Sequence, residues 1–553
     1  MVRLSAYIRS KPDWWLKYKD PVIRNRWKAE ALNSTMVWIT EKSLLVPLVQ
    51  APALCRNGRV DPELKVTLSE AQVEYVLGEL GGYDRLLDEP SGIQVSCFDG
   101  FWQSDTLISQ NTRDALTEAI SPLENVPEHM KDWHPRSNNL VLDIVHPSLY
   151  CLVYGRSLGY VSPKQDPYAG LLEAVSAPAN VEGSDLMSNR FSWLPTDFKV
   201  SETGDVTALA YINNIYPSHK SLYKSVEAVL SCFIPMFERV LTDLSHPLPY
   251  RIPGDYFKMS HELDELYPED EMDWHAIAEW EEVWMKKKTL FLPDVPQDGY
   301  TGGRENRKCV VKIRGRTIQV IVKLGNIHLT PQNPAYEGGA WHVEGMRNED
   351  IVATGIYYYD NENITHNELA FRAAVAQPQP SEDRRQVDNY DEYSHKILWG
   401  LQYNLNSELN QCVGAVSSIT GRCIAFPNTY QHCVSPFRLE DPTKPRHRKI
   451  LAFFLVDPDR PPIPSTSVVP PQQLAWARDA LLESAADPAS RMHTLPPEIV
   501  TMVLNSIDMM DDKEAKDIRL ELMDERTPKP RDHFWDDDDG SDVFTRLFNL
   551  CEH

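Results

Sequence analysis

Two histidines and one glutamate are the residues of this 553-residue chain whose types and spacing best suit metal chemistry. His342 and Glu344 lie one residue apart in GGAWHVEGM (338–346), and on a β-strand this spacing points both side chains to the same face. His432 follows in FPNTYQHCVSP (426–436). Two imidazoles and one carboxylate on one face of a metal form a triad that holds iron(II) and leaves positions open for substrates and oxygen. These residues therefore predict a reactive metal site, because structural sites close their coordination sphere.

Short apolar segments flank both parts of this triad and favour an antiparallel sheet around it. Runs rich in β-branched and aromatic residues, bounded by Gly, Pro or Asn, are typical of strands. The order of strands and ligands predicts an α+β protein whose core is a jelly roll, or double-stranded β-helix, with the ligands converging in the mouth of the barrel. The four segments are TIQVIVKLGNIHL (317–329), DIVATGIYYYD (350–360), GRCIAFPN (421–428) and RKILAFFLVDP (448–458).

The segment 317–458 resembles the core of iron(II)/2-oxoglutarate-dependent dioxygenases, and its pattern is similar to that of prolyl hydroxylase-type members. In that family a T-x-I-Y-Y strand follows the His-x-Asp/Glu pair, and the distal histidine follows a G-x-x-x-x-F strand. The whole chain also resembles a large fungal family of proteins of unknown function, through stretches such as FSWLPTDF and GGAWHVEGMRNEDIVATGIYYYDNEN. The residues that match the dioxygenase pattern are Thr354, Ile356, Tyr357 and Tyr358 for the first strand, and Gly421, Phe426 and His432 for the second.

The dioxygenase resemblance implies a complete set of cofactor contacts. Iron(II) would be held by His342, Glu344 and His432, and Arg448 would bind the far carboxylate of 2-oxoglutarate with help from Tyr358. Arginine suits that role because its planar fork forms two parallel hydrogen bonds with a carboxylate. Arg446 is the fallback, because the loop between His432 and Arg448 is longer than is usual in the family. The implied reaction hydroxylates a C–H bond of an unidentified small-molecule or protein substrate and converts 2-oxoglutarate to succinate.

Glu344 is a departure from the commoner aspartate of the family. Its extra methylene moves the carboxylate oxygen, so the strand must lie slightly further from the metal. His366 and Glu368 form a competing pair with the same spacing, but they follow the tyrosine-rich strand. We interpret His328 as a packed histidine at the rim of the sheet, and Asp143 and His146 as structural residues.

Two other classes of function remain open. The first is a jelly-roll scaffold or ligand-binding protein without enzymatic activity, which would retain no iron. The second is a metal dioxygenase of the cupin type, which uses the same barrel without 2-oxoglutarate. Arg448 separates this last class from the oxygenase, because a cupin has no need of an arginine at the head of that strand.

Composition and charge exclude several partners. The net charge of −24 and the pI of about 5.1 disfavour binding to nucleic acid. Nine scattered cysteines without a C-x-x-C pair favour a reducing compartment, and no apolar run is long enough to span a membrane. We therefore expect an intracellular protein, cytoplasmic or nuclear, that is not bound to membranes. The sequence does not indicate its oligomeric state.

Changes in pattern along the chain predict four regions. Residues 1–295 are helix-rich, with helices predicted over 221–244 and 271–288 and some strands that extend the barrel. Residues 296–460 form the catalytic core, and a proline-rich linker covers 461–473. The C-terminal region, 474–553, is helical and carries an acidic tail with the run DDDD at 536–539.

Overall fold

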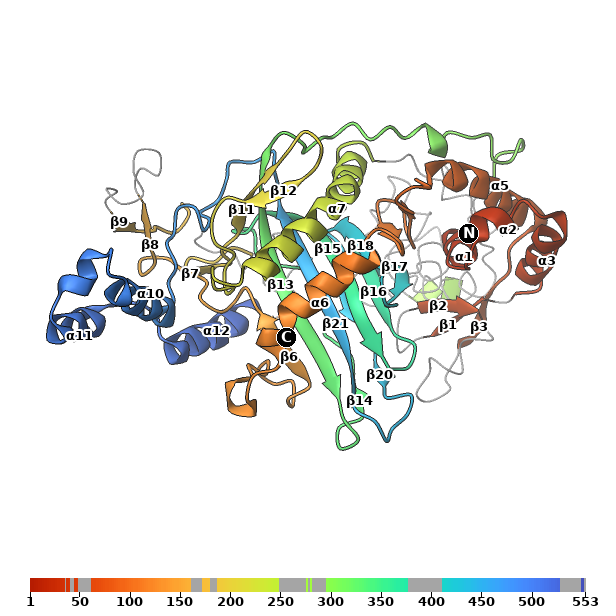
Figure 1. Ribbon diagram of the computed structural model, residues 1–553. Coiled ribbons are helices and arrows are strands. Elements are labelled where there is room, and N and C mark those ends of the chain that lie inside the picture. Colours follow the sequence, from red (N-terminus) through yellow and green to blue (C-terminus); the bar gives the residue numbers. More distant parts are fainter. Residues whose placement is uncertain are drawn as a thin grey trace.

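The fold is a mixed α+β arrangement in which helices cover one face of a large antiparallel sheet (Figure 1). The computed structural model describes residues 1–34, 67–160, 172–179, 186–247, 295–375, 410–527 and 549–551, with the helical pairs 275–276 and 279–280. Of three further strands only the backbone is described: β1 (Met36–Ile39), β2 (Leu44–Pro47) and β3 (Asp61–Val66). Most of the helix predicted over 271–288 and the acidic run at 536–539 lie outside the described residues.

The large sheet has nine strands in the order β12-β11-β13-β21-β15-β18-β5-β4, with β6 paired to β13. Long central strands are rich in β-branched and aromatic residues, which suit a pleated surface buried on both faces. The sheet ends at β12 and β4, so the described strands form an open sheet and the expected closed barrel is not seen among them. The strands are β4 (Gln94–Val95), β5 (Trp102–Ser104), β6 (Val141–Val145), β11 (Thr196–Val200), β12 (Val206–Ala208), β13 (Thr317–Leu329), β15 (Ile351–Glu362), β18 (Cys423–Pro427) and β21 (Arg446–Val456).

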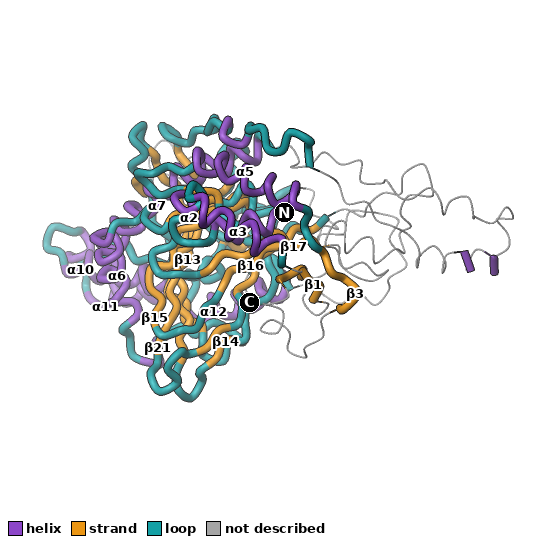
Figure 2. The backbone as a smooth tube through the Cα atoms, turned by 90° about the vertical axis from the view of Figure 1, so that its right-hand side faces the viewer, coloured by secondary structure: helices purple, strands orange, loops and turns teal. Residues whose placement is uncertain are grey.

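A smaller sheet, β17-β16-β19, packs over one face of the large sheet. Leu369 and Phe371 of this sheet lie in one buried cluster with Phe426 and Phe454 of the large sheet. Figure 2 shows the two groups of strands side by side, with β13, β15 and β21 on one side and β16 and β17 on the other. The strands on the smaller side are β14 (Ala335–Tyr336), β16 (Glu368–Ala374), β17 (Asn410–Ser417), β19 (Gln431–Val434) and β20 (Phe437–Arg438), where β14 pairs with β20.

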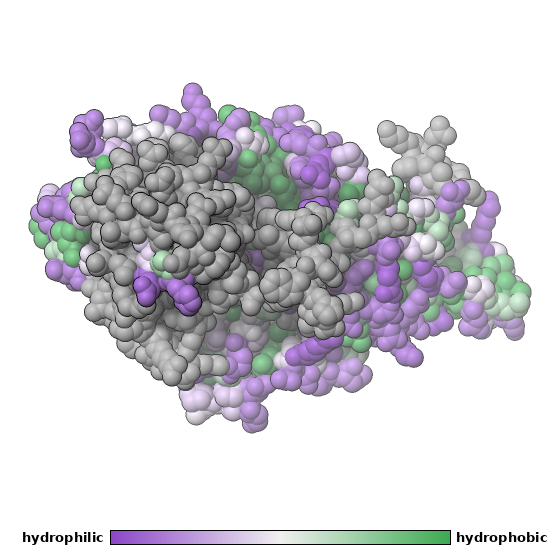
Figure 3. All heavy atoms as spheres, turned by 180° about the vertical axis from the view of Figure 1, so that it is seen from behind, coloured by the Kyte–Doolittle hydropathy of each residue, from purple (hydrophilic) through white to green (hydrophobic). Residues whose placement is uncertain are grey.

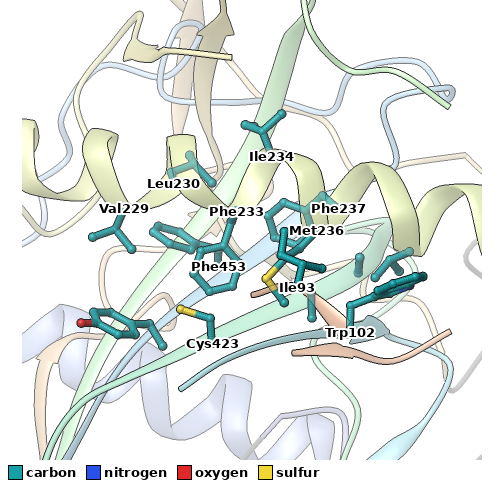
Figure 4. Close-up of a cluster of buried hydrophobic side chains, with 14 of the residues drawn as sticks. Ile93, Trp102, Val229, Leu230, Phe233, Ile234, Met236, Phe237, Cys423 and Phe453 are labelled. Carbon is teal, nitrogen blue, oxygen red and sulfur yellow. The ribbon is translucent and has the colours of Figure 1, made fainter. Parts of the chain in front are cut away.

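Helices cover the opposite face of the large sheet. The helix predicted over 221–244 is confirmed as α7 (Lys220–Ser245), which includes Pro235. Phe233 of α7 packs against Phe453 of β21 with ring centroids 5.5 Å apart (Figure 4). The helix can approach this closely because β15 has Gly355 at the contact, where a Cβ atom would lie 2.8 Å from Phe233. Full burial of each such aromatic side chain contributes roughly 1.5–3 kcal/mol.

The remaining elements lie around this core. In the N-terminal part they are α1 (Val2–Arg9), α2 (Trp14–Lys17), α3 (Pro21–Leu32), α5 (Glu70–Leu86), α6 (Gln110–Glu124), β7 (Leu152–Val153), β8 (Leu158–Tyr160), β9 (Leu172–Ala174) and β10 (Phe191–Ser192). The C-terminal part has α10 (Leu474–Ala486), α11 (Pro497–Ser506) and α12 (Asp512–Arg526). Short 3-10 turns are formed by Glu128–Met130, Arg304–Asn306 and Arg491–Thr494.

The segment predicted as a linker, 461–473, contains no helix or strand but is not a free spacer. Its Ser465, Val469 and Gln473 are buried against the body of the molecule. The helices that follow are more exposed, and hydrophobic side chains gather at the end of the molecule where α10 and α11 lie (Figure 3). None of the described helices is both long and apolar enough to cross a membrane.

Candidate metal centre

His342 and His432 lie on neighbouring backbone segments that bond to each other. His342 follows β14 in the chain, and His432 lies on β19. The His342 N–H donates to the His432 carbonyl at 3.0 Å, and the His432 N–H donates to the His342 carbonyl at 2.9 Å. This reciprocal pair fixes the two backbones directly opposite each other, so both imidazoles leave the strands toward the same side.

The three predicted ligand side chains converge in a buried site. Nε2 of His342 lies 3.6 Å from Oε1 of Glu344, and Nε2 of His432 lies 3.4 Å from the same oxygen. The exposed fractions of His342, Glu344 and His432 are 1%, 4% and 2%. Metal–ligand bonds of about 2.0–2.2 Å place neighbouring donor atoms roughly 3 to 3.5 Å apart, so one divalent cation fits between these atoms.

Backbone carbonyls orient both imidazoles. Nδ1 of His342 lies 2.8 Å from the Ala340 carbonyl, and Nδ1 of His432 lies 3.4 Å from the Tyr430 carbonyl. Because a carbonyl only accepts hydrogen bonds, each Nδ1 carries the proton and each Nε2 presents its lone pair to the site. Metal-binding histidines commonly have this outer hydrogen bond, which fixes the tautomer and the ring orientation.

The Glu344 carboxylate is ionised, and one of its two oxygens has no hydrogen-bond partner among the described residues. Burial works to raise the pKa of Glu344, but the adjoining side chains of His342 and His432 outweigh it and hold that pKa well below its usual range. Oε2 of Glu344 is buried and has no hydrogen-bond partner. A buried carboxylate oxygen without a partner is costly, and a cation bound between the three side chains would remove that cost.

Arg448 and Tyr358 form a second polar feature between the two sheets. The Arg448 guanidinium lies 5.0 Å from the centre of the Tyr358 ring, and Arg448 is only 3% exposed. Nε of Arg448 and the hydroxyl of Tyr358 are both buried without a hydrogen-bond partner. No described carboxylate lies within ion-pair distance of Arg448. A buried guanidinium without an anion is unfavourable, so this pair is suited to an anionic ligand.

The fallback clamp and the competing pair lie in different surroundings. Arg446 is partly exposed and its Nε is already paired with Glu362 at 2.9 Å. His366 and Glu368 bond to each other at 3.1 Å, and their side chains are 68% and 43% exposed. His328 packs edge-on against Trp133 and contacts none of the three triad residues in the described interactions.

A second buried cluster of the same composition was not predicted as a site. His134, Asp143 and His146 place one donor atom each within 4.8 Å of the others. Nδ1 of His134 lies 2.8 Å from Oδ2 of Asp143, and Arg519 of α12 donates to the same oxygen at 3.2 Å. The Ser148 N–H donates to Nδ1 of His146 at 3.2 Å. Asp143 lies on β6 and His134 lies on the segment paired with it, so the cluster is built on paired strands.

Two further features of the site were missed in the sequence. Asn428, at the end of β18, binds the backbone of Glu344 through its side-chain amide. Residues 549–551 lie beside the metal-binding segment, where the Val343 N–H donates to the Asn549 carbonyl at 3.1 Å. The FPN triplet ahead of His432 was a possible signal for the contact of Asn428 with Glu344. The contact of Val343 with Asn549 joins segments about 200 residues apart and left no local signal.

Comparisons with known proteins were informative about family but not about chemistry. A family model described as "Protein of unknown function (DUF4246)" matches residues 70–480, and the N-terminal domain model of the same name matches residues 1–30. No curated protein matches the chain.

Three similar solved structures illustrate how distant the structural likeness is. The Fe(II)/(alpha)ketoglutarate-dependent dioxygenase TqaL is 9% identical, with a TM-score of 0.26 over 65% of this chain and 78% of its own. IDO from Bacillus thuringiensis is 8% identical, with a TM-score of 0.24 over 66% and 91%. A bsmA homologue from Methylobium petroleophilum PM1 is 8% identical, with a TM-score of 0.23 over 63% and 84%. Likeness at this level carries no argument about activity, so the chemistry must be argued from the site.

Proposed function

The chain belongs to the DUF4246 family of proteins of unknown function, and we propose that it is an iron(II)- and 2-oxoglutarate-dependent oxygenase that hydroxylates a C–H bond. The observation that carries the proposal is the convergence of His342, Glu344 and His432 in a buried site, with an unpaired guanidinium in the same interior. His432 packs against Phe426, and Phe426 belongs to the same buried cluster as Tyr358 below Arg448. The metal-binding and anion-binding groups therefore border the same buried cluster.

The order of the strands supports a jelly-roll interpretation of this interior. Along the chain, β13, β15, β18 and β21 enter the large sheet, where their spatial order is β13-β21-β15-β18. The segments between them enter the small side, where β19 lies between β16 and the His342 segment. In a jelly roll, one chain contributes strands to two sheets in alternation. In this molecule the candidate ligands His342 and His432 come from the smaller side.

The donor set fits iron(II). Two neutral imidazoles and one carboxylate would hold it through Nε2 of His342, Nε2 of His432 and Glu344, and would leave open positions. When bound there, the metal supplies oxygen activation and the two-electron oxidation that couples decarboxylation of 2-oxoglutarate to hydroxylation.

The side chains around the metal would divide the remaining work. Arg448 would bind the distal carboxylate of 2-oxoglutarate through charge-assisted hydrogen bonds, and the Tyr358 hydroxyl would donate a further one. The aromatic residues between the sheets would exclude water, which strengthens these interactions and protects the oxidising species from side reactions. The carbonyls of Ala340 and Tyr430 would keep both ligand imidazoles in the tautomer that binds metal.

Binding of 2-oxoglutarate to the iron-loaded protein tests this proposal. Under anaerobic conditions the wild-type protein should bind iron(II) and then 2-oxoglutarate, and admission of oxygen should yield succinate. Arg448→Ala should weaken 2-oxoglutarate binding by about 30-fold or more, because loss of charge-assisted hydrogen bonds costs about 2 kcal/mol or more. Iron(II) binding should change little in this variant.

Arg446→Ala is the matched control, since it removes an arginine from the same strand two residues away. Its pairing with Glu362 is partly exposed, so the variant should change 2-oxoglutarate affinity by less than about fivefold. Equal loss in both variants would contradict the assignment of Arg448. A wild-type protein that binds iron but neither binds nor consumes 2-oxoglutarate would favour a metal dioxygenase without that co-substrate.

A further inference from the structure

We propose that Asn428 is a positioning residue that sets the metal-binding geometry of Glu344, an inference that rests on the proposed function. Asn428 directly follows β18 and precedes His432 by only a few residues. Its side chain therefore connects the segment that carries one ligand to the segment that carries the other two.

The contact is a two-way clamp on one residue. Oδ1 of Asn428 accepts from the Glu344 N–H at 3.0 Å, and Nδ2 of Asn428 donates to the Glu344 carbonyl at 2.7 Å. Nδ2 also donates to the Ile351 carbonyl at 3.2 Å, and the Asn428 N–H donates to the Val352 carbonyl at 3.0 Å. One amide thus fixes both peptide groups of Glu344 and joins them to the start of β15.

Such a clamp matters more for glutamate than for aspartate. Glutamate has one more rotatable bond, so its carboxylate position depends strongly on a fixed backbone. Glu344 lacks a regular ladder partner at this point, because the hydrogen bonds of its own N–H and carbonyl are made by the Asn428 side chain. Without the clamp, Glu344 could shift relative to His342 and His432, and the three donor atoms would no longer converge.

Asn363 provides a matched control from elsewhere in the chain. Its Oδ1 accepts from the Asp441 N–H at 2.7 Å, and its Nδ2 donates to the Asp441 carbonyl at 3.0 Å and to the Lys444 carbonyl at 3.2 Å. The hydrogen-bonding pattern is the same as that of Asn428, but Asn363 clamps a surface loop after β20. Variants of the two asparagines can therefore be compared. The comparison separates the general effect of losing such hydrogen bonds from an effect that is specific to the metal site.

The test uses Co(II) as the metal probe and the full chain. Co(II) affinity and the visible d–d spectrum are measured for the wild type and for Asn428→Ala, Asn428→Asp, Asn363→Ala and Asn363→Asp. The Asp variants keep the shape and the acceptor but lose the donor. Both Asn428 variants should bind Co(II) about 10- to 100-fold more weakly, with an altered spectrum, which is the usual effect of removing an outer partner of a metal ligand. Both Asn363 variants should keep the affinity and spectrum of the wild type.

The outcomes separate this inference from the proposed function. If the wild type binds Co(II) and the Asn428 variants match it in affinity and spectrum, the positioning role is wrong and the metal site stands. Equal weakening by the Asn363 variants would also overturn the role, because it would reduce the effect to general stability. A wild type that binds no Co(II) would overturn the metal site itself. If Asn428→Ala does not fold, the isosteric Asn428→Asp decides the question.

Discussion

Two buried clusters in this molecule have nearly the same composition, yet their hydrogen bonds differ. His342, Glu344 and His432 lie between the two sheets, whereas His134, Asp143 and His146 lie near β6 and α12. In both clusters two imidazoles and one carboxylate come within 4.8 Å. Proximity alone therefore does not identify a metal site, and the partners of each donor atom must be compared.

In the first cluster the donor atoms face one another across a short distance. Each of its Nδ1 atoms faces a backbone carbonyl, so each Nε2 offers a lone pair, and Oε2 of Glu344 has no partner. In the second cluster the carboxylate already binds Arg519, and Nδ1 of His146 already accepts a backbone N–H. A cation would have to compete with a guanidinium that is held by Asp132 as well. The comparison indicates that the first cluster is suited to metal and the second to holding α12 on the body of the protein.

Metal stoichiometry gives the largest effect that this comparison predicts. The wild-type protein should bind one equivalent of Fe(II) or Co(II). His432→Ala should lose tight binding altogether, because only two of the three ligands remain, whereas His146→Ala should still bind one equivalent. Metal content after anaerobic dialysis measures the difference. Two equivalents in the wild type, with one lost in His146→Ala, would show that the second cluster also binds metal.

Unfolding of the metal-free protein should reverse the ranking of the two clusters. Arg519→Met leaves Asp132 and Asp143 without their shared cation, and removal of one partner from a buried ion pair costs about 3–5 kcal/mol. Glu344→Gln should lower the free energy of unfolding by about 1 kcal/mol or less, since the amide keeps the shape of the carboxylate and its N–H group can donate to the lone pair of an imidazole Nε2. Urea denaturation in the presence of a chelator compares the variants. A larger loss for Glu344→Gln than for Arg519→Met would contradict the structural role of the second cluster.

The backbone at the first cluster makes a smaller and more specific prediction. Gly345 follows Glu344 with a φ of +73°, and a Cβ atom there would lie 2.9 Å from Ile351 Cδ1. Gly155 has a φ of +77° but nothing within 4 Å of its Cβ position. Each change to alanine should cost about 1–2 kcal/mol of stability for the left-handed conformation. Only Gly345→Ala should also weaken Co(II) binding, because it displaces the turn beside a ligand; equal Co(II) affinity in the two variants would exclude this link.

The sequence predicted the parts of the site that depend on local periodicity. His-x-Glu spacing placed two ligands on one face. Tyr358 and Arg448, which lie together between the sheets, were expected only through the resemblance to the dioxygenase family. The helix over 221–244 was confirmed, and its apolar stripe is buried in the cluster that includes Phe453 of the sheet. The His-x-Glu spacing and the helical stripe follow the period of a single element, so they are visible without knowledge of the fold.

The features that the sequence did not predict depend on contacts between distant segments. Arg519 reaches Asp143 over 376 positions, and the Asn428 amide reaches Glu344 over 84. Neither a cluster of ions nor a side-chain clamp leaves a periodic pattern in the chain. The sequence predicted strands in residues 1–295 that extend the sheet, but it did not locate β4, β5 or β11, because these strands have only two to five residues each.

His328 is a single buried imidazole outside both clusters. We expect its substitution to have the smallest effect of the changes considered. Its Nε2 is buried without a partner, as in a ligand, but the nearest rings belong to Trp133 and His447 rather than to a second ligand and a carboxylate. Burial lowers the pKa of His328 to about 4, with His447, Lys449 and Lys131 acting in the same direction and Glu124 against it. Because this folded-state pKa is below the unfolded value of about 6.5, the unfolded chain binds more protons between pH 6.5 and 4, and stability falls as the pH falls through that window.

Lowering the pH from 7 to 5.5 should therefore cost about 1 kcal/mol through His328, and His328→Asn should remove that part of the pH dependence. The measurement is the free energy of unfolding of both proteins at the two pH values, without metal. His447→Asn serves as the neighbouring control, because His447 already has a partner in Asp360 at 2.7 Å. An unchanged pH dependence in His328→Asn would mean that this buried nitrogen is not shielded as the structure indicates. A loss confined to this variant would support the shielding of this buried nitrogen from solvent.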